Sequence, residues 1–189
     1  VLTLSQSGET FDTISALKFA KSKSAKTAAI VNVMGSSISR LVDKVILQGS
    51  GPEICVISTK AAFAQMITLT ILALKLSLKT KKIKRREYDA SINSIRELPE
   101  VIQNILNERS GFIHRIANNY SKVKNWLYLG RGIYYPVALE SALKMKEVAY
   151  VHAEGMPGGF LKHGTLAMID QDVNSIVFIP PSSDKKLYE

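Results

Sequence analysis

The sequence predicts an α/β protein with two doubly wound parallel-sheet units, each incomplete, joined by a helical connector. Two observations lead to this class. Apolar, strand-like segments alternate with helical segments near both ends of the chain, and strands that are apolar throughout are typical of parallel sheets covered on both faces. The middle of the chain has a helical pattern and no strand candidate. We therefore expect units at residues 1–83 and 125–189 and a connector at residues 84–124.

The first unit is expected to alternate strands and helices. Its long final helix, at about residues 58–78, follows a turn marked by Gly49, Gly51 and Pro52. The elements expected before that turn are strands at 1–5, 27–33 and 43–48, an amphipathic helix at 9–23 and a short helix at 36–43.

The connector and the second unit are read in the same way. Pro99 is expected to begin a helix within the connector, because proline is favoured in a first helical turn. The elements expected afterwards are a strand at 126–130, a helix reaching residue 150, a glycine-rich segment at 151–170 that leads into a short helix, and a strand at 174–181. Because Val1 lies inside a strand and the chain stops soon after another strand, we expect a piece of a longer protein.

Composition indicates a folded protein of a reducing compartment. Of the 189 residues, 46% are apolar and 22% are charged, which is ordinary for a globular protein. The lone Cys55 excludes an internal disulfide, and we expect it to pack at a helix entry. Nothing at the start resembles a signal peptide. The apolar stretch from Met66 to Leu78 is interrupted by Lys75 and looks too short and too polar to cross a membrane. We expect a cytoplasmic protein with no membrane partner.

The net charge of +9 is concentrated in the segment KLSLKTKKIKRRE. Such a run could bind phosphate groups, but it also suits the solvated end of a long helix, where cations meet the negative end of the helix dipole. We favour the solvated helix end. No aromatic residues interleave with the cations, as single-stranded nucleic acid would prefer, so no nucleic-acid partner is expected. The cations are Lys75, Lys79, Lys81, Lys82, Lys84, Arg85 and Arg86.

The segment SQSGET follows the first strand, at the edge of a parallel sheet where ligands bind. Ser5, Gln6, Ser7 and Thr10 offer neutral hydrogen-bonding groups, and glycine lets the backbone approach a ligand closely. The start of the next helix favours an anion. This combination fits a phosphate monoester. The alternative is simple helix capping by Ser7 or Thr10, with Glu9 in the first turn.

Two further groups could carry acid–base chemistry. Glu140, Lys144 and Glu147 have the spacing that places them on one face of a helix, where a partly buried carboxylate could transfer protons; an exposed stabilising ion pair is the alternative. His163 lies in a glycine-bounded loop and could be an acid or base, although a surface or capping role is the simpler interpretation. No metal-ligand spacing and no GxGxxG motif are present, so no metal or organic cofactor is expected.

Three long segments together resemble a known family. SQSGET, GPEICVISTKAAF and the run from residue 129 to residue 170 occur in the order found in the isomerase part of glucosamine-6-phosphate synthases, which is built from two sugar isomerase (SIS) domains. The resemblance covers nearly the whole chain except the connector. It implies two SIS-type units and an enzyme that makes glucosamine 6-phosphate from fructose 6-phosphate, with ammonia released from glutamine by a separate glutaminase domain upstream.

The resemblance also implies roles for individual residues. Val56 and Ser58 would line the sugar site, and Glu147 would move a proton between C1 and C2 of the sugar, with Lys144 beside it and Glu140 an acid on the same face. His163 would help to open the sugar ring, coming from the neighbouring subunit of a homodimer. The phosphate would be held by Ser5, Gln6, Ser7 and Thr10.

Several features depart from the family pattern. The lysine that forms the family's Schiff base is expected beyond Glu189, and we expect the 189-residue chain alone to be inactive. Gly159 and Phe160 stand where a small residue and an acid are expected, and Ser141 stands where glycine is expected. Two alternatives stay open: a stand-alone two-SIS glucosamine-6-phosphate deaminase, and a SIS-type sugar-phosphate sensor that regulates transcription.

Overall fold

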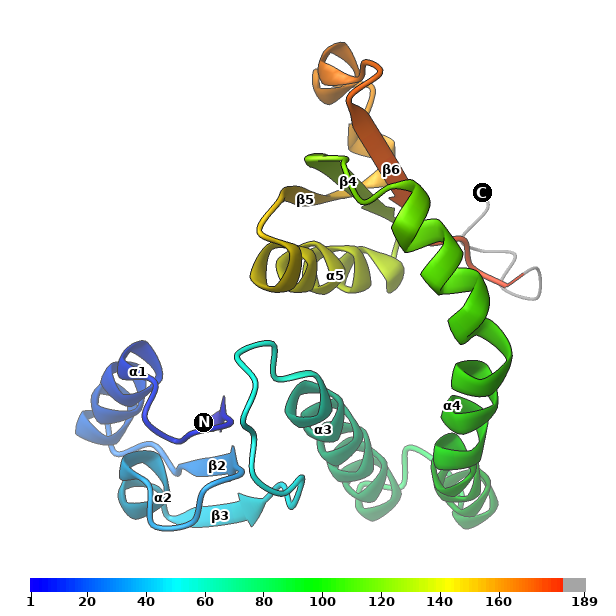
Figure 1. Ribbon diagram of the computed structural model, residues 1–189. Coiled ribbons are helices and arrows are strands. Elements are labelled where there is room, and N and C mark those ends of the chain that lie inside the picture. The colour runs from blue at the N-terminus through cyan, green and yellow to red at the C-terminus, as the bar shows by residue number, and fades with distance from the viewer. Residues whose placement is uncertain (182–189) are drawn as a thin grey trace. The chain divides into compact units, whose positions relative to one another are not determined.

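The computed structural model describes residues 1–181, so the last eight residues of the expected second unit lie outside the described part (Figure 1). The elements, in chain order, are β1 (Leu2–Ser5), α1 (Phe11–Ser22), β2 (Ala28–Val31), α2 (Ser37–Leu41), β3 (Lys44–Leu47), α3 (Thr59–Lys79), α4 (Arg85–Asn119), β4 (Asn125–Gly130), α5 (Tyr134–Ala149), β5 (His152–Pro157), two 3₁₀ turns η1 (Gly158–Phe160) and η2 (Thr165–Met168), and β6 (Val173–Val177).

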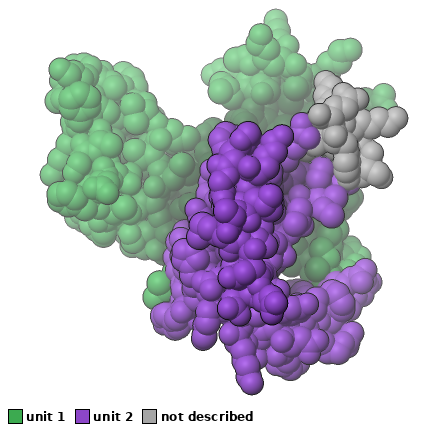
Figure 2. All heavy atoms as spheres, turned by 90° about the horizontal axis from the view of Figure 1, so that it is seen from above, with its two compact units in different colours: residues 1–105 green, residues 106–189 purple. Residues whose placement is uncertain are grey.

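The chain forms two compact units, Val1–Ile105 and Leu106–Glu189 (Figure 2). Helix α4 begins in the first unit and ends in the second. Each unit contains a three-stranded sheet whose strand pairs are all parallel. The predicted α/β class is therefore confirmed.

The first sheet has the order β1-β2-β3, with β2 in the middle. Ala29 and Val31 of β2 are fully buried, and they pack with Leu17 of α1 and Ile38 of α2 in one apolar cluster. Alternate residues of a strand face the same side of a sheet, so α1 and α2 cover the same face. This packing fixes the carboxyl edge of the sheet, where the loops after β1, β2 and β3 meet.

The second sheet has the order β5-β4-β6. Helix α5 packs on it through Ala138 and Ala142, against Trp126 and Tyr128 of β4. The packing is close: a Cβ added to Gly155 on β5 would lie 2.7 Å from the Leu139 Cα. Strand β5 lies at the start of the glycine-rich segment and was not predicted from the sequence. A glycine weakens the pattern of a strand, and the close packing that requires Gly155 is not visible in the sequence.

Pro99 does not begin a helix, so that prediction was wrong. It lies inside α4, a single helix of 35 residues. Proline removes one helical hydrogen bond, but Pro99 lines an apolar groove in the first unit with Phe63 and Ile67 of α3 and Ile102 of α4. Pro99 thus lies in a groove that residues of α3 also line.

Helix α3 is longer than the apolar stretch judged from the sequence. It spans 21 residues, and by length and composition it could cross a membrane. The prediction that this stretch is too short was therefore wrong. The core helix of a globular protein can have the same length and composition.

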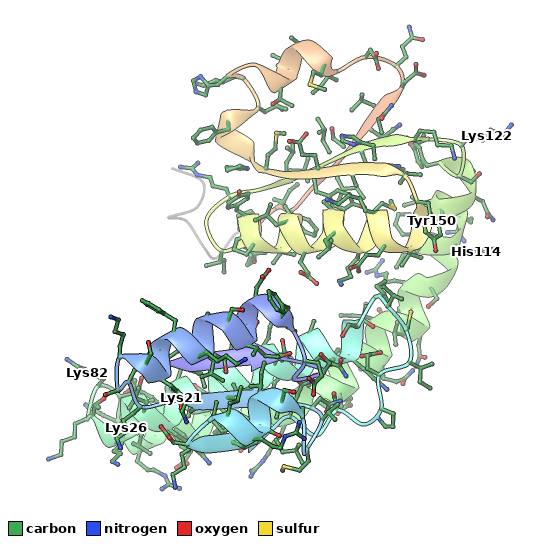
Figure 3. All side chains as sticks on the ribbon, turned by 90° about the vertical axis from the view of Figure 1, so that its left-hand side faces the viewer. Lys21, Lys26, Lys82, His114, Lys122 and Tyr150 are labelled. Atoms are coloured by element: carbon green, nitrogen blue, oxygen red, sulfur yellow. The ribbon has the colours of Figure 1, made fainter. Side chains whose placement is uncertain are left out.

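Two surface predictions have opposite outcomes. Cys55 is exposed rather than packed, because the segment before α3 lies outside the sheet. The seven cations of the KLSLKTKKIKRRE run are all exposed, as expected for a solvated helix end. Figure 3 shows Lys82 on this turn, with Lys21 and Lys26 also on the surface of the first unit.

Candidate functional site

The SQSGET loop, residues 5–10, is held by its own hydroxyl groups. Ser5 is buried at the end of β1, and its Oγ accepts a hydrogen bond from the Gly8 N–H at 3.0 Å. Its Oγ also lies 2.8 Å from Thr10 Oγ1 in a hydroxyl–hydroxyl bond. Thr10 is the residue before α1, yet its side chain makes no capping bond. The Ser7 Oγ accepts from the Glu9 N–H at 3.2 Å. The capping alternative is thus wrong for Thr10.

Glu9 links the SQSGET loop to α2, which its sequence position did not predict. It precedes the first turn of α1, where the acid is Asp12. Its Oε1 accepts a hydrogen bond from the Ser37 N–H at the start of α2, at 2.8 Å. Hydrogen bonding to the Ser37 side chain, and then to its backbone N–H, lowers the pKa of Glu9 below its usual value, with a smaller contribution from the nearby charge of Arg40. Glu9 therefore ties the SQSGET loop to α2.

Position 8 of the loop must be glycine for two reasons. Its φ is +70°, in the left-handed region that side chains disfavour. A Cβ at this position would lie 2.0 Å from Ser36 Oγ. Its carbonyl oxygen accepts the Ile38 N–H at 2.9 Å. The loop can approach α2 this closely only without a side chain.

The ICVISTK segment, residues 54–60, leads into α3. Val56 is 84% exposed. Ser58, directly before the helix, has a left-handed backbone with φ +53° and makes no capping bond. Instead Glu53 Oε2 accepts the Ala61 N–H at 3.3 Å. Because Glu53 supplies this bond, the Ser58 hydroxyl is not engaged in capping α3.

Helix α5 carries the second group of candidate residues. Lys144 Nζ lies 2.7 Å from Glu147 Oε2 and 3.3 Å from Glu140 Oε1, which confirms that the three share one helix face. That face is turned away from Ala138 and Ala142, which pack on the sheet. The side chains of Lys144 and Glu147 are only 20% and 25% exposed. The Lys144–Glu147 pair is therefore more sheltered than an ordinary surface ion pair.

The charge state of Lys144 follows from these contacts. Burial alone would lower its pKa, since burial disfavours the charged form. The hydrogen bonds to Glu147 and then Glu140 act in the opposite direction and prevail, so the pKa of Lys144 is raised. Lys144 is thus a fixed positive charge beside the Glu147 carboxylate at neutral pH.

His163 lies between η1 and η2, beyond the carboxyl end of β5. It is exposed, its N–H donates to the Phe160 carbonyl at 2.9 Å, and its ring meets that of Phe160 edge-on with centroids 6.0 Å apart. Within the described residues, no hydrogen bond or ion pair joins His163 to the α5 carboxylates. The first unit contains the candidate residues of the SQSGET and ICVISTK segments, and the second unit contains those of α5 together with His163.

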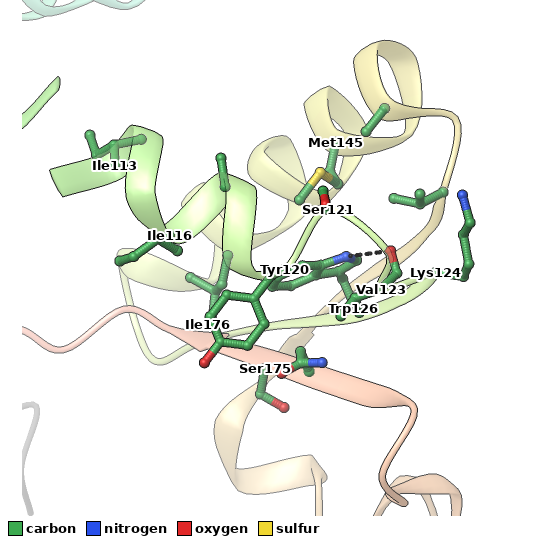
Figure 4. Close-up of a pocket in the computed structure, with 14 residues that line it drawn as sticks. Ile113, Ile116, Tyr120, Ser121, Val123, Lys124, Trp126, Met145, Ser175 and Ile176 are labelled. Atoms are coloured by element: carbon green, nitrogen blue, oxygen red, sulfur yellow. Dashed lines mark hydrogen bonds between the residues drawn. The ribbon is translucent and has the colours of Figure 1, made fainter. Parts of the chain in front are cut away.

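The second unit also contains an apolar cavity of about 470 Å³ (Figure 4). Tyr120 and Trp126 meet edge-on in its wall at 6.1 Å, and the Trp126 Nε1–H donates to the Val123 carbonyl at 3.4 Å. Met145 lines this cavity from the side of α5 that faces the sheet. The cavity is therefore distinct from the Lys144 cluster on the other face of α5. In residues 1–181, no group of three or more His, Cys, Asp or Glu side chains is placed to hold a metal ion.

The fold and these loops correspond to a known family of domains. The SIS domain family matches residues 1–75 and 119–188. This chain belongs to the SIS domain family. The match includes most of α3.

This chain is also similar to named proteins over most of its length. Glutamine–fructose-6-phosphate aminotransferase (isomerizing) from Methanococcus maripaludis is 43% identical over 187 residues, which cover 99% of this chain and 30% of that protein. The protein of that name from Fusobacterium nucleatum is 46% identical over 170 residues, 90% of this chain and 28% of that protein. The chain thus spans less than a third of the length of these curated relatives.

Solved structures also match this chain in their fold. The C-terminal domain of glucosamine-fructose-6-phosphate aminotransferase from Francisella tularensis superposes with a TM-score of 0.91 at 34% identity, covering 99% of this chain and 53% of that one. Glucosamine-6-phosphate deaminase from Thermotoga maritima gives a TM-score of 0.69 at 17% identity, covering 98% of this chain and 54% of that one, a likeness of fold alone. The predicted SIS-type fold is confirmed.

Proposed function

We propose that this chain is the isomerase portion of an enzyme that makes glucosamine 6-phosphate from fructose 6-phosphate, using ammonia released from glutamine. The observation that carries the proposal is the paired Ser5 and Thr10 hydroxyls, 2.8 Å apart at the carboxyl edge of the first sheet. The Thr10 hydroxyl does not cap α1. The aminotransferase names of relatives that are 43% and 46% identical support the reaction.

The first unit would bind the substrate through neutral groups. Ser5, Gln6, Ser7 and Thr10 would hold the phosphate with hydrogen bonds from hydroxyl, amide and backbone N–H groups at the start of α1. Val56 and Ser58 would line the sugar site. The Ser58 hydroxyl suits this role because Glu53 supplies the bond to the first turn of α3.

The second unit would supply the proton transfers. Glu147 would take the proton from C1 of the ketose imine and return it to C2, while O1 loses its proton and the nitrogen gains one, giving the amino aldose. Lys144 would hold Glu147 in place and ionised, and Glu140 would hold Lys144 from the other side. His163 would act at the ring oxygen to open the sugar. These steps need no metal or organic cofactor.

The partners of the chain follow from the same proposal. A glutaminase domain in the full-length chain would supply ammonia, and a second copy would form a homodimer and contribute His163 to its neighbour. Residues 84–124 would connect the two SIS units. The enzyme would work in the cytoplasm, with neither nucleic acid nor membrane as a partner.

The test is an assay of the full-length protein with fructose 6-phosphate and glutamine. Formation of glucosamine 6-phosphate that requires both substrates is the expected result. Release of ammonia from glucosamine 6-phosphate, with no use of glutamine, would identify a deaminase instead. Binding of the sugar phosphate without turnover of either kind would identify a sensor.

A further inference from the structure

Asn32 lies directly after β2, the middle strand of the first sheet. Because the three strands are parallel, the carboxyl end of β2 is flanked by the ends of β1 and β3. The SQSGET loop continues from β1, and the loop of residues 49–58 follows β3 and Gln48. Asn32 therefore lies between the two loops that are the candidates for holding phosphate and sugar.

Asn32 is hydrogen-bonded to both loops. Its backbone N–H donates to the Gln6 carbonyl at 3.1 Å. Its side-chain Nδ2 donates to the Gly51 carbonyl at 2.7 Å, and its Oδ1 accepts the Ser50 N–H at 3.1 Å. The pattern needs one donor and one acceptor in a single planar group, which an amide provides. A carboxylate would place an oxygen against the Gly51 carbonyl.

The 49–58 loop has few other supports. It lies outside the strand ladder, which ends at Leu47, and its Ile54 and Val56 side chains are 94% and 84% exposed. Gln48 Nε2 donates to Ser50 Oγ at 2.8 Å, Lys60 Nζ donates to the Pro52 carbonyl at 2.5 Å, and Glu53 Oε2 accepts the Ala61 N–H at 3.3 Å. Because so little apolar surface of this loop is buried, its position depends on side-chain hydrogen bonds.

We propose that Asn32 is a positioning residue that fixes the 49–58 loop relative to the SQSGET loop. It thereby sets the distance between phosphate and sugar ring in the ligands that the two loops can bind. This inference rests on the proposed function, which assigns those two ends of the substrate. Asn32 touches neither end itself and acts only through the loops.

The first experiment separates the two ends of the ligand. In the full-length enzyme, Asn32→Asp keeps the backbone bond to Gln6 but loses the donor to Gly51. The Kd for fructose 6-phosphate, measured by calorimetry, should rise about tenfold or more, the equivalent of one or two lost hydrogen bonds. The Kd for inorganic phosphate should rise less than about threefold. Asn93→Asp, an exposed asparagine on α4, makes the same charge change and should alter neither value.

The outcomes distinguish the two proposals. Equal loss of affinity for both ligands, or no loss for either, would contradict the positioning role. A wild-type enzyme that binds inorganic phosphate but not fructose 6-phosphate would instead overturn the proposed function, and the positioning role with it.

A second measurement needs no variant, in case Asn32→Asp does not fold. Saturating the wild-type enzyme with inorganic phosphate should slow amide hydrogen exchange in a peptide covering residues 48–58 by about twofold or more, because the bound SQSGET loop fixes Asn32 and Asn32 fixes Ser50 and Gly51. Unchanged exchange in that peptide, with phosphate bound, would show that Asn32 does not link the loops.

Discussion

Lys144 and Glu147 form an ion pair 2.7 Å long on the face of α5 that is turned away from its own sheet. The two residues are three positions apart in the sequence. Glu140, one turn earlier, places its Oε1 3.3 Å from the Lys144 Nζ. A lone exposed ion pair contributes little to stability. Sheltered carboxylates that are held by a fixed cation are more typical of sites where charge is used in a reaction.

We predict that Glu147→Gln in the full-length enzyme abolishes turnover but not binding. The amide keeps the shape of the side chain but cannot accept a proton from C1, so kcat should fall about 10²- to 10⁴-fold. The Kd for fructose 6-phosphate should change less than about threefold, because in the proposed site the phosphate would be held by the first unit. A steady-state assay with calorimetry measures both quantities. Glu100→Gln, an exposed acid on α4, is the control, and unchanged kcat in Glu147→Gln would remove Glu147 from the mechanism.

Gly8→Ala is predicted to disable the SQSGET loop. A left-handed backbone alone costs a non-glycine residue about 1–2 kcal/mol, and the new methyl group would meet Ser36 Oγ at 2.0 Å. The loop must move away from α2, so the Kd for inorganic phosphate should rise about tenfold or more. Gly111→Ala on α4 has open space around it, with only Arg115 Nη1 at 4.0 Å, and should stabilise the helix by about 0.5–1 kcal/mol. Phosphate affinity that survives in Gly8→Ala would refute this account of the loop.

Asp43 gives the first unit a pH-dependent contribution to stability. Its Oδ2 accepts the Thr27 N–H at 2.8 Å and the Thr27 hydroxyl at 3.1 Å, and these bonds lower the pKa of Asp43 below its usual value. A lowered carboxyl pKa means that the contribution is present above about pH 4 and is lost as the pH falls through the folded-state pKa. Asp43→Asn should therefore lower the urea midpoint at pH 7, and the gap from wild type should close towards pH 3. A gap of the same size at both pH values would contradict the prediction.

The sequence predicted the features that depend on local pattern. Apolar runs located β1, β2 and β3, and the spacing of Glu140, Lys144 and Glu147 placed them on one face, because the period of a helix is fixed. The SIS fold followed from long motifs in the right order.

The features that it missed depend on contacts between distant segments. Gly155 interrupts the pattern of β5 because α5 packs against it. Pro99 lies inside α4, in a groove that α3 also lines. Glu9 and Glu53 reach backbone N–H groups 28 and 8 residues away, and no local rule pairs an acid with a helix start at such separations.

The homodimer proposal leads to a complementation test. If His163 acts in the neighbour's site, Glu147→Gln and His163→Ala dimers should each be nearly inactive, but a mixed dimer has one site with both wild-type residues. Random exchange makes half of the dimers mixed, so the mixture should recover about a quarter of wild-type activity. Mixing Glu147→Gln with a Glu147→Gln, His163→Ala double variant is the control and should recover nothing, since no site then keeps Glu147. If both variants are inactive alone and the first mixture stays inactive although subunits exchange, as tagged copies would show, then His163 acts within its own chain.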